Sequence, residues 1–235
     1  MQLSTDPVRD FFLQQEELFT DEFYFESKPN LDNLRAMDQR INRVPALSWE
    51  ELKTKALTCT RCPLATTRLN VVFGVGDSQT NLLFIGEAPG EQEDLKGEPF
   101  VGRAGQLLDK ILAAIQMKRE QVYITNILKC RPPNNRSPHA SEIELCEPYL
   151  QNQIDLIQPK LIVCLGLVAA KTLLRVEYNM QEMRGKIYNY HGVDLMVTYH
   201  PAALLRNPYL KKFAWEDFQK IRDLYYQQES LNRDS

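Results

Sequence analysis

Short apolar runs alternate with helical patterns over about 150 residues, and this alternation restricts the fold more than any other feature. Four runs are predicted to be buried strands: NLLFIG (81–86), QVYITN (121–126), KLIVCLG (160–166) and DLMVTYH (194–200). Between the first two, GRAGQLLDKILAAIQ (102–116) places its leucines and isoleucines on one helical face. Alternating strands and helices favour a parallel or mostly parallel sheet that is covered by helices on both faces.

Further helices are predicted from their start signals and their apolar spacing. Ser48 and Glu51 form a capping-box pattern at the start of SWEELKTKAL, and Ser141 with Glu144 suggests a second box that opens a helix to about Gln158. Shorter helical patterns follow in LVAAKTLLR and near 209–226. We therefore expect an acidic extension (1–46), partly helical or flexible, then one domain (47–228) and a polar tail (229–235).

Charge and hydropathy set the broad class of protein. No stretch has the 18–20 consecutive apolar residues that a membrane helix needs, and the N-terminus lacks the pattern of a secretory signal. We expect a soluble, cytoplasmic chain with no membrane partner. The net charge is −3, but residues 1–50 carry ten acidic and only five basic side chains. The remaining chain is slightly basic, so a basic face that binds a polyanion is not excluded.

Three loops of unusual composition each follow the carboxyl end of a predicted strand. They are GEAPGEQED, LKCRPPNNRSP and HPAALLRNP. Ligands of open α/β sheets bind at this edge, so the three loops are predicted to form one site. The first loop lacks the Gly-Lys-Ser/Thr ending of a phosphate-binding loop, and its four acidic residues make an ATPase unfavourable.

Four of the five cysteines have the spacing of a metal centre. Cys59 and Cys62 form a C-x-x-C that is followed by proline, and Cys130 and Cys146 come from distant segments. Zinc sites usually contain two close pairs, whereas a proline follows a ligand cysteine in ferredoxin-type runs. The spacing therefore favours an iron–sulfur cluster, with structural zinc and unligated thiols as alternatives. Cys164 lies inside an apolar strand and is expected to be a core residue.

One aromatic, one amide and one imidazole are predicted to meet at the strand edge. Phe100 lies in GEPFVGRAG, Asn126 ends the second strand and His200 ends the last. Each alone is most often structural. Together they suit a pocket for a flipped nucleobase, where a ring stacks on the base and an amide reads its Watson–Crick edge.

These segments resemble family 4 uracil-DNA glycosylases, which contain an iron–sulfur cluster. The resemblance rests on GEAPGEQED, GEPFVGRAG, ITNILKCRPPNNRSP and HPAALLRNP with the upstream C-x-x-C, and it covers roughly residues 50–226. It implies a three-layer α/β/α sandwich around a four-stranded, mostly parallel sheet, and excision of uracil from DNA. It also implies a [4Fe–4S] cluster on Cys59, Cys62, Cys130 and Cys146.

The same resemblance assigns the site residues. Phe100 matches the stacking aromatic, Asn126 the asparagine that reads uracil, and His200 the histidine near the base; Gly86, Glu87 and Ala88 complete the pocket. Glu87, Glu93 and Asn135 match polar positions that support activity. The better-known family 1 enzymes have a water-positioning aspartate where Ala88 stands here. The resemblance therefore does not assign the residue that positions the attacking water. No basic insert follows FVGRAG, so covalent trapping of DNA is not expected.

DNA contacts are predicted for basic and apolar residues in or beside the three loops. Arg103, Arg131, Arg136 and Arg206 are expected to meet phosphates, with Lys129 beside a ligand cysteine, and Leu204 and Leu205 to enter the gap left by the flipped base. The last two leucines have a competing interpretation as helix core. The chain is expected to be a monomer, and partner proteins are not indicated.

Three other functions compete with this interpretation. A non-catalytic iron–sulfur DNA-binding protein would need altered pocket residues. An electron carrier would not need the Asn/His/Phe pocket. A glycosylase for another deaminated base, such as hypoxanthine or xanthine, stays open because a few loop side chains decide which base is bound.

Overall fold

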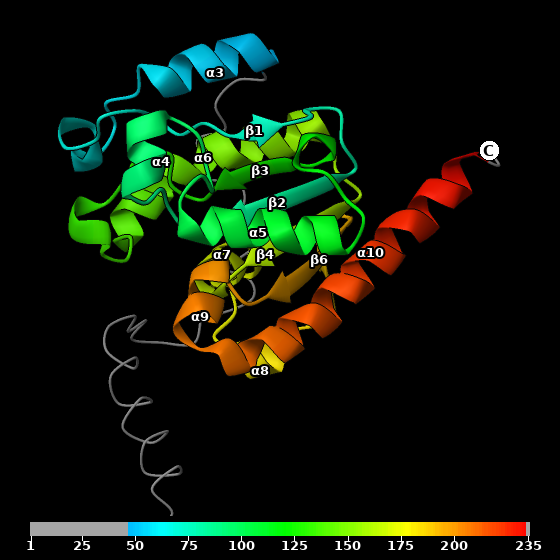
Figure 1. The fold of residues 1–235 in the computed structure, drawn as a ribbon. Coiled ribbons are helices and arrows are strands. Elements are labelled where there is room, and N and C mark those ends of the chain that lie inside the picture. Colours follow the sequence, from blue (N-terminus) through cyan, green and yellow to red (C-terminus); the bar gives the residue numbers. More distant parts are fainter. Residues whose placement is uncertain (1–46, 234–235) are drawn as a thin grey trace, which may run out of the picture. The chain divides into compact units, whose positions relative to one another are not determined.

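A central sheet organises the protein, which is described here from a computed structural model covering residues 47–233 and the side chains to 227 (Figure 1). The predicted extension 1–46 lies outside the described residues. The six strands are β1 (Val75–Gly76), β2 (Leu82–Gly86), β3 (Tyr123–Asn126), β4 (Leu161–Leu165), β5 (Ile187–Tyr190) and β6 (Val193–Thr198). Their order in the sheet is β1-β3-β2-β4-β6-β5.

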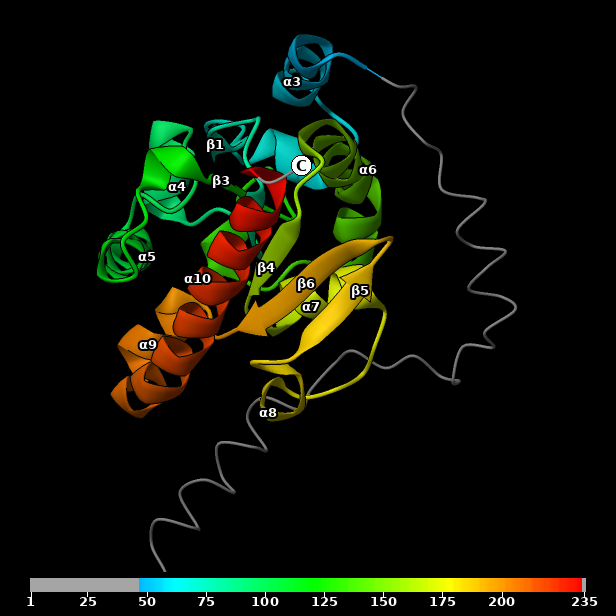
Figure 2. The same cartoon turned by 90° about the vertical axis from the view of Figure 1, so that its right-hand side faces the viewer.

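The four predicted parallel strands form the middle of this sheet. β3, β2, β4 and β6 are parallel, with Gly86 opposite Asn126 and Cys164 opposite Val197. The sheet is larger than the four strands expected, because β1 and β5 are added antiparallel at its two edges. Figure 2 shows β5 beside β6 at one of these edges. Continuous burial of β2 and β4 explains why both read as unbroken apolar runs.

Helices of the described chain connect and cover these strands. The α-helices are α3 (Trp49–Leu57), α4 (Glu91–Lys96), α5 (Arg103–Ala114), α6 (Ala140–Ile157), α7 (Leu167–Leu174), α8 (Met180–Met183), α9 (Pro201–Arg206) and α10 (Lys211–Arg233). Four short 3₁₀ turns are η1 (Pro63–Thr66), η2 (Arg119–Gln121), η3 (Pro133–Asn135) and η4 (Pro208–Leu210). Since α10 continues to Arg233, most of the predicted polar tail is helical in its backbone. Within the described residues, no helix combines the length and the apolar character that a membrane crossing requires.

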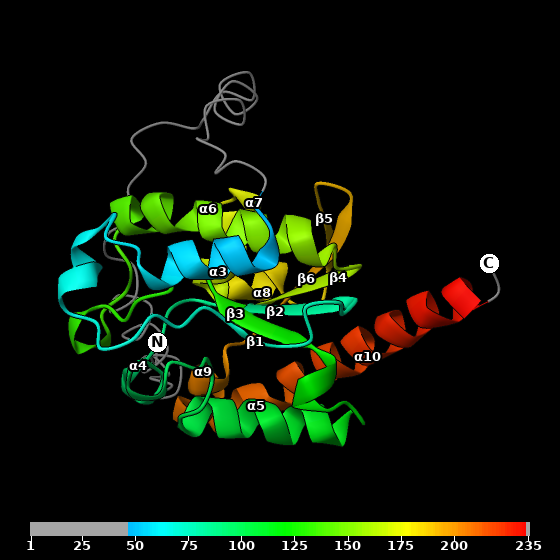
Figure 3. The same ribbon diagram turned by 90° about the horizontal axis from the view of Figure 1, so that it is seen from above.

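Alternate side chains of the strands build two core layers. Leu83 and Ile85 face α6 and α7, whereas Leu82 and Phe84 face α5 and α10. Figure 3 shows α6 and α7 on one side of the sheet and α5 and α10 on the other. The predicted three-layer α/β/α sandwich is confirmed.

Of the two capping boxes that the sequence predicts, one is present in the structure and the other is not. Ser48 and Glu51 form the predicted capping box of α3. The second prediction was wrong, because α6 begins at Ala140 and Ser141 lies inside its first turn. The capping carboxylate belongs to Glu142, which accepts the amide of His139 over 2.9 Å and pairs with Arg136 over 2.6 Å. This ion pair fixes the entry of the chain into α6.

Candidate active site and cysteine pocket

The segments that follow β2, β3 and β6 meet at the carboxyl edge of the sheet, as predicted. The ring centroids of Phe100 and His200 are 5.4 Å apart with an angle of 32° between the planes. A Cβ added to Gly86 would overlap Asn126 Oδ1 and lie 2.7 Å from Cζ of Phe100. Gly86, Phe100, Asn126 and His200 therefore surround one small region, in which only a glycine fits at the end of β2.

Asn126 presents an unused acceptor in this region. Its side chain is 2% exposed, and Oδ1 has no hydrogen-bond partner. It is the one buried side-chain nitrogen or oxygen without a partner in the part of the chain that the structure describes. Because an unpaired buried acceptor is costly, this oxygen indicates a position where a ligand N–H is bound.

His200 is held as a neutral donor. Its Nδ1 accepts the backbone N–H of Ala202 over 3.1 Å at the start of α9, so the proton of the neutral ring lies on Nε2. Burial, and then the charge of Arg206, lower the pKa of His200 to about 4. The ring can therefore donate one hydrogen bond at neutral pH without carrying a charge.

Gly166 is a site residue that the sequence analysis missed. It follows β4 with a φ of 98°, and an added Cβ would lie 3.1 Å from Cβ of His200. Its only signal in the sequence is a glycine directly after a buried strand, a position at the same sheet edge as the three loops.

Glu87 is the polar group that links the three loops. It is partly buried, and burial raises its pKa, while a hydrogen bond with Ser137 and the charge of Arg206 oppose the rise. Ser137 belongs to the segment after β3 and Arg206 ends α9. Glu87 therefore lies between elements that are far apart in the sequence.

The other two predicted polar residues have structural contacts. Oε1 of Glu93 accepts the amides of Val101 and Gly102 over 2.9 and 2.8 Å, at the start of α5. Asn135 is exposed, and its Oδ1 accepts Nε of Arg131 over 2.8 Å. The structure thus gives Glu93 a loop-holding contact rather than a place against a bound base, and Ala88 is partly buried against the core.

The predicted DNA-contacting residues separate into free and engaged groups. Arg103, Leu205 and Arg206 are exposed. Arg136 is held by both oxygens of Glu142, so its charge is already paired. Leu204 was assigned wrongly as a wedge: it is 1% exposed and packs with Tyr199 and Ala214, because α9 turns it inward.

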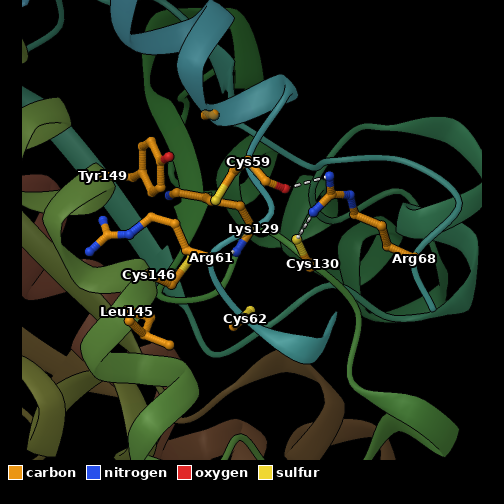
Figure 4. A pocket seen from close by; sticks show the side chains of 10 residues that line it. Cys59, Arg61, Cys62, Arg68, Lys129, Cys130, Leu145, Cys146 and Tyr149 are labelled. Atoms are coloured by element: carbon orange, nitrogen blue, oxygen red, sulfur yellow. Dashed lines mark hydrogen bonds between the residues drawn. The ribbon is translucent and has the colours of Figure 1, made fainter. Parts of the chain in front are cut away.

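The four predicted cysteines line one pocket (Figure 4). Cys59 follows α3, Cys62 precedes η1, Cys130 follows β3, and Cys146 lies on α6. Arg61 and Arg68 line the same pocket and bring positive charge to it. Lys129 also lines it, but its Nζ donates to Thr125, Gln153 and the carbonyl of Asn126, and burial lowers its pKa to about 7. The expectation that Lys129 meets phosphates was wrong, because the side chain is buried. Cys164 is fully buried in β4, as expected for a core residue.

Two nitrogen donors point at sulfur in this pocket. Nη1 of Arg68 is 3.2 Å from Sγ of Cys130, and the amide of Lys129 is 3.3 Å from Sγ of Cys146. Burial raises the pKa of Cys146 to about 12 and also raises that of Cys130. No three His, Cys, Asp or Glu side chains of the described chain are arranged to hold a single metal ion, although these four thiols enclose a shared space.

Comparison with known proteins identifies the family. Residues 73–219 match the model of the uracil DNA glycosylase superfamily. The chain is 45% identical over 185 residues to the type-4 uracil-DNA glycosylase of Archaeoglobus fulgidus, covering 75% of this chain and 93% of that protein. It is 47% identical over 186 residues to the type-4 enzyme of Sulfurisphaera tokodaii (75% and 84% covered). The type-4 enzyme of Thermotoga maritima is 41% identical over 177 residues (74% and 92% covered). With Phe100, Asn126 and His200 gathered at the strand edge of an α/β/α core, the chain belongs to the uracil DNA glycosylase superfamily and, within it, to the type-4 uracil-DNA glycosylases.

Proposed function

We propose that this protein removes uracil from DNA by hydrolysing the N-glycosidic bond, which releases free uracil and leaves an abasic site. The observation that carries the proposal is the unpaired, buried Oδ1 of Asn126, which lies beside Gly86 where an added Cβ would also meet the ring of Phe100. Relatives that are 41–47% identical over 177–186 aligned residues are uracil-DNA glycosylases. The activity belongs to DNA repair.

The amide of Asn126 selects uracil by the pattern of donors and acceptors. Uracil presents N3–H, which Oδ1 can accept, and O4, to which Nδ2 can donate. Cytosine has an acceptor at N3 and an amino donor at N4, so the same amide orientation opposes it at both atoms. Leaving Oδ1 unpaired beside cytosine would cost about 1–3 kcal/mol. Phe100 supplies the face on which the flipped base stacks.

The bond breaks with its electron pair passing to N1 of uracil. C1′ gains oxocarbenium character, and a water oxygen then bonds to C1′ while the proton that this water loses finally neutralises the released uracil anion. His200 donates from Nε2 to a uracil carbonyl oxygen, where the negative charge of the leaving group develops. A neutral imidazole suits this step because it is already the stable form at pH 7. Glu87, whose pKa is raised, is the residue we assign to orienting the water.

We also propose that the cysteine pocket holds a [4Fe–4S] cluster on Cys59, Cys62, Cys130 and Cys146. Four thiols from separate segments around a cationic pocket suit an anionic cluster that carries thiolate ligands, and two N–H groups already point at sulfur. When bound, the cluster would cross-link α3, η1, the loop after β3, and α6. Structural zinc is the alternative, and metal analysis with visible absorption distinguishes them.

DNA is proposed to bind across the same edge. Arg103 and Arg206 would meet phosphates, with Arg131 beside them and Leu205 at the gap in the base stack. Each neutralised phosphate releases counterions, so affinity should fall steeply with salt. Arg206→Gln should reduce the slope of log K against log salt by about 1. Lys160→Gln is the matched control, because Lys160 directly precedes β4 at the opposite sheet edge.

The test of function is single-turnover excision from otherwise identical duplexes that contain uracil, hypoxanthine or xanthine. We expect release of uracil and none of the other bases at a comparable rate. Faster release of hypoxanthine or xanthine would assign the pocket to another deaminated base. Specific binding without any base release would indicate a non-catalytic DNA-binding protein.

A further inference from the structure

The backbone of Phe100 is held in an unusual conformation. Its φ is 54°, a left-handed value that a bulky aromatic residue rarely adopts. Such strain persists only where the surrounding structure enforces it, and it gathers at functional sites. The ring of this residue is the proposed stacking face for uracil. The contacts that hold its left-handed backbone conformation therefore also position the ring.

Arg119, which comes from a separate part of the chain, donates hydrogen bonds to the carbonyls of Pro99 and Phe100. It begins η2, nineteen residues beyond Phe100, and its Nη1 donates to the carbonyl of Phe100 over 3.1 Å. Its Nη2 donates to the carbonyl of Pro99. Nη1 also lies 2.9 Å from Oδ1 of Asp109 on α5, and this ion pair fixes the guanidinium. A planar guanidinium can bind two successive carbonyls at once, whereas an ammonium is a single compact charge.

Two further contacts restrict the same turn. Glu93 accepts the amides of Val101 and Gly102, the two residues after Phe100. Gly105 faces the Phe100 carbonyl so closely that an added Cβ would overlap it. The carbonyl of Phe100 is thus directed at Arg119 and bounded by Gly105, while the amides beyond it are held by Glu93.

We propose that Arg119 is a positioning residue for the excised base: its guanidinium holds the left-handed turn at Phe100 and thereby sets the ring that stacks on uracil. This inference rests on the proposed function, since it names what builds the stacking face. The hydrogen bonds of Arg119 go to the main chain of the turn and to Asp109. Its loss should therefore impair capture of the base and leave the phosphate contacts of the duplex intact.

The main variants are Arg119→Met, which removes the hydrogen-bond donors, and Arg119→Lys, which keeps the positive charge but lacks the planar guanidinium that binds two carbonyls. Lys118→Met is the matched control, because Lys118 is the exposed neighbour. We expect Arg119→Met to lower the single-turnover rate about 10- to 100-fold, as expected for release of backbone strain at one residue. Inhibition by free uracil should weaken in parallel, and affinity for undamaged duplex should change less than about twofold. Arg119→Lys should fall in between.

A double-mutant cycle with Phe100→Ala separates positioning from general stability. Once the ring is absent, Arg119→Met should slow excision by no more than about threefold, because the two residues act through one contact. Full additivity of the two losses would overturn the inference, and so would unchanged inhibition by free uracil in Arg119→Met. If Arg119→Met does not fold, Arg119→Lys and Asp109→Asn replace it in the same cycle. Absence of uracil excision by the wild-type protein would instead refute the proposed function.

Discussion

The backbone amide of Ala202 donates to Nδ1 of His200 over 3.1 Å, so the start of α9 fixes which ring nitrogen of the neutral imidazole carries the proton. The same contact explains how a histidine can cap a helix and serve the pocket. The cap uses Nδ1 and leaves Nε2–H as the donor that we assign to a uracil oxygen. Burial of the ring, and then the charge of Arg206 at the other end of α9, disfavour a second proton on His200.

The first prediction concerns pH. The pKa of His200 is about 4 in the folded protein, below its ordinary value of about 6.5 in an unfolded chain. The unfolded chain therefore binds this proton more readily, so between pH 6.5 and 4 the group increasingly opposes folding as pH falls. His200→Asn keeps a capping oxygen without a titrating ring. The Tm of the wild type should fall more than that of this variant across the window, measured by thermal unfolding.

The excision rate gives the second part of that test. No loss due to protonation of His200 should occur between pH 8 and 5, and His200→Asn should be slow throughout this range. Parallel Tm profiles for wild type and variant would contradict the lowered pKa.

The second prediction separates the pocket from the scaffold. Asn126→Asp keeps the size of the side chain but replaces the donor to O4 with a second acceptor. The ionised carboxylate would repel both O4 and the charge that develops on the base. Loss of one such donor costs about 10²–10³-fold in rate, roughly 3–4 kcal/mol. Single-turnover excision should collapse while the variant stays folded at the assay temperature, with a lower Tm because a charge is buried, and keeps the visible absorbance of the proposed cluster.

The control for this variant is Asn189→Asp on exposed β5, where Oδ1 accepts the amide of Gly192 and can still do so as a carboxylate. This change should leave excision intact. A near wild-type rate for Asn126→Asp would mean that the pocket does not read uracil through this amide.

The third prediction concerns the cysteines. The purified protein should be brown, with broad visible absorption and four irons per chain bound through four thiolates. Alanine at Cys59, Cys62, Cys130 or Cys146 should remove the colour and lower the stability, because the proposed cluster would join distant segments. Cys164→Ala should keep the colour and cost on the order of 1 kcal/mol, measured by denaturant unfolding. Colourless, zinc-containing and fully active protein would favour the structural zinc site.

The middle of the fold could be predicted because burial on both faces leaves a continuous apolar signal. The observed β2 and β4 begin within one residue of the runs that predicted them. The edge strands carry no such signal: β1 has two residues, and β5 is largely exposed. Their pairing depends on a neighbour that the local sequence does not reveal.

The site was predictable where it depends on strand ends, and not where it depends on contacts between loops. Asn126 and His200 end or follow strands whose carboxyl ends must share an edge, so their meeting with Phe100 followed from topology. The contact of Arg119 with Phe100 joins two irregular segments and has no sequence pattern. Likewise, Ser141 with Glu144 and His139 with Glu142 are equally spaced, and only the ion pair with Arg136 selects the second.

The last prediction uses two neighbouring leucines whose environments the sequence cannot separate. HPAALLRNP was expected to be a loop, but residues 201–206 form α9, which buries Leu204 and leaves Leu205 38% exposed. Leu204→Ala should therefore lower the free energy of unfolding by about 2–5 kcal/mol, as for other buried leucines. Leu205→Ala should leave stability within about 0.5 kcal/mol of the wild type.

Their effects on excision should be the reverse of their effects on stability. If Leu205 fills the gap left by the flipped base, Leu205→Ala should slow excision from a duplex much more than from single-stranded DNA, since only the duplex closes behind the base. Leu204→Ala, assayed below its Tm, should slow both substrates equally. The measurement is the ratio of single-turnover rates on the two substrates. An unchanged ratio in Leu205→Ala would remove this residue from the DNA interface and leave base flipping to the pocket itself.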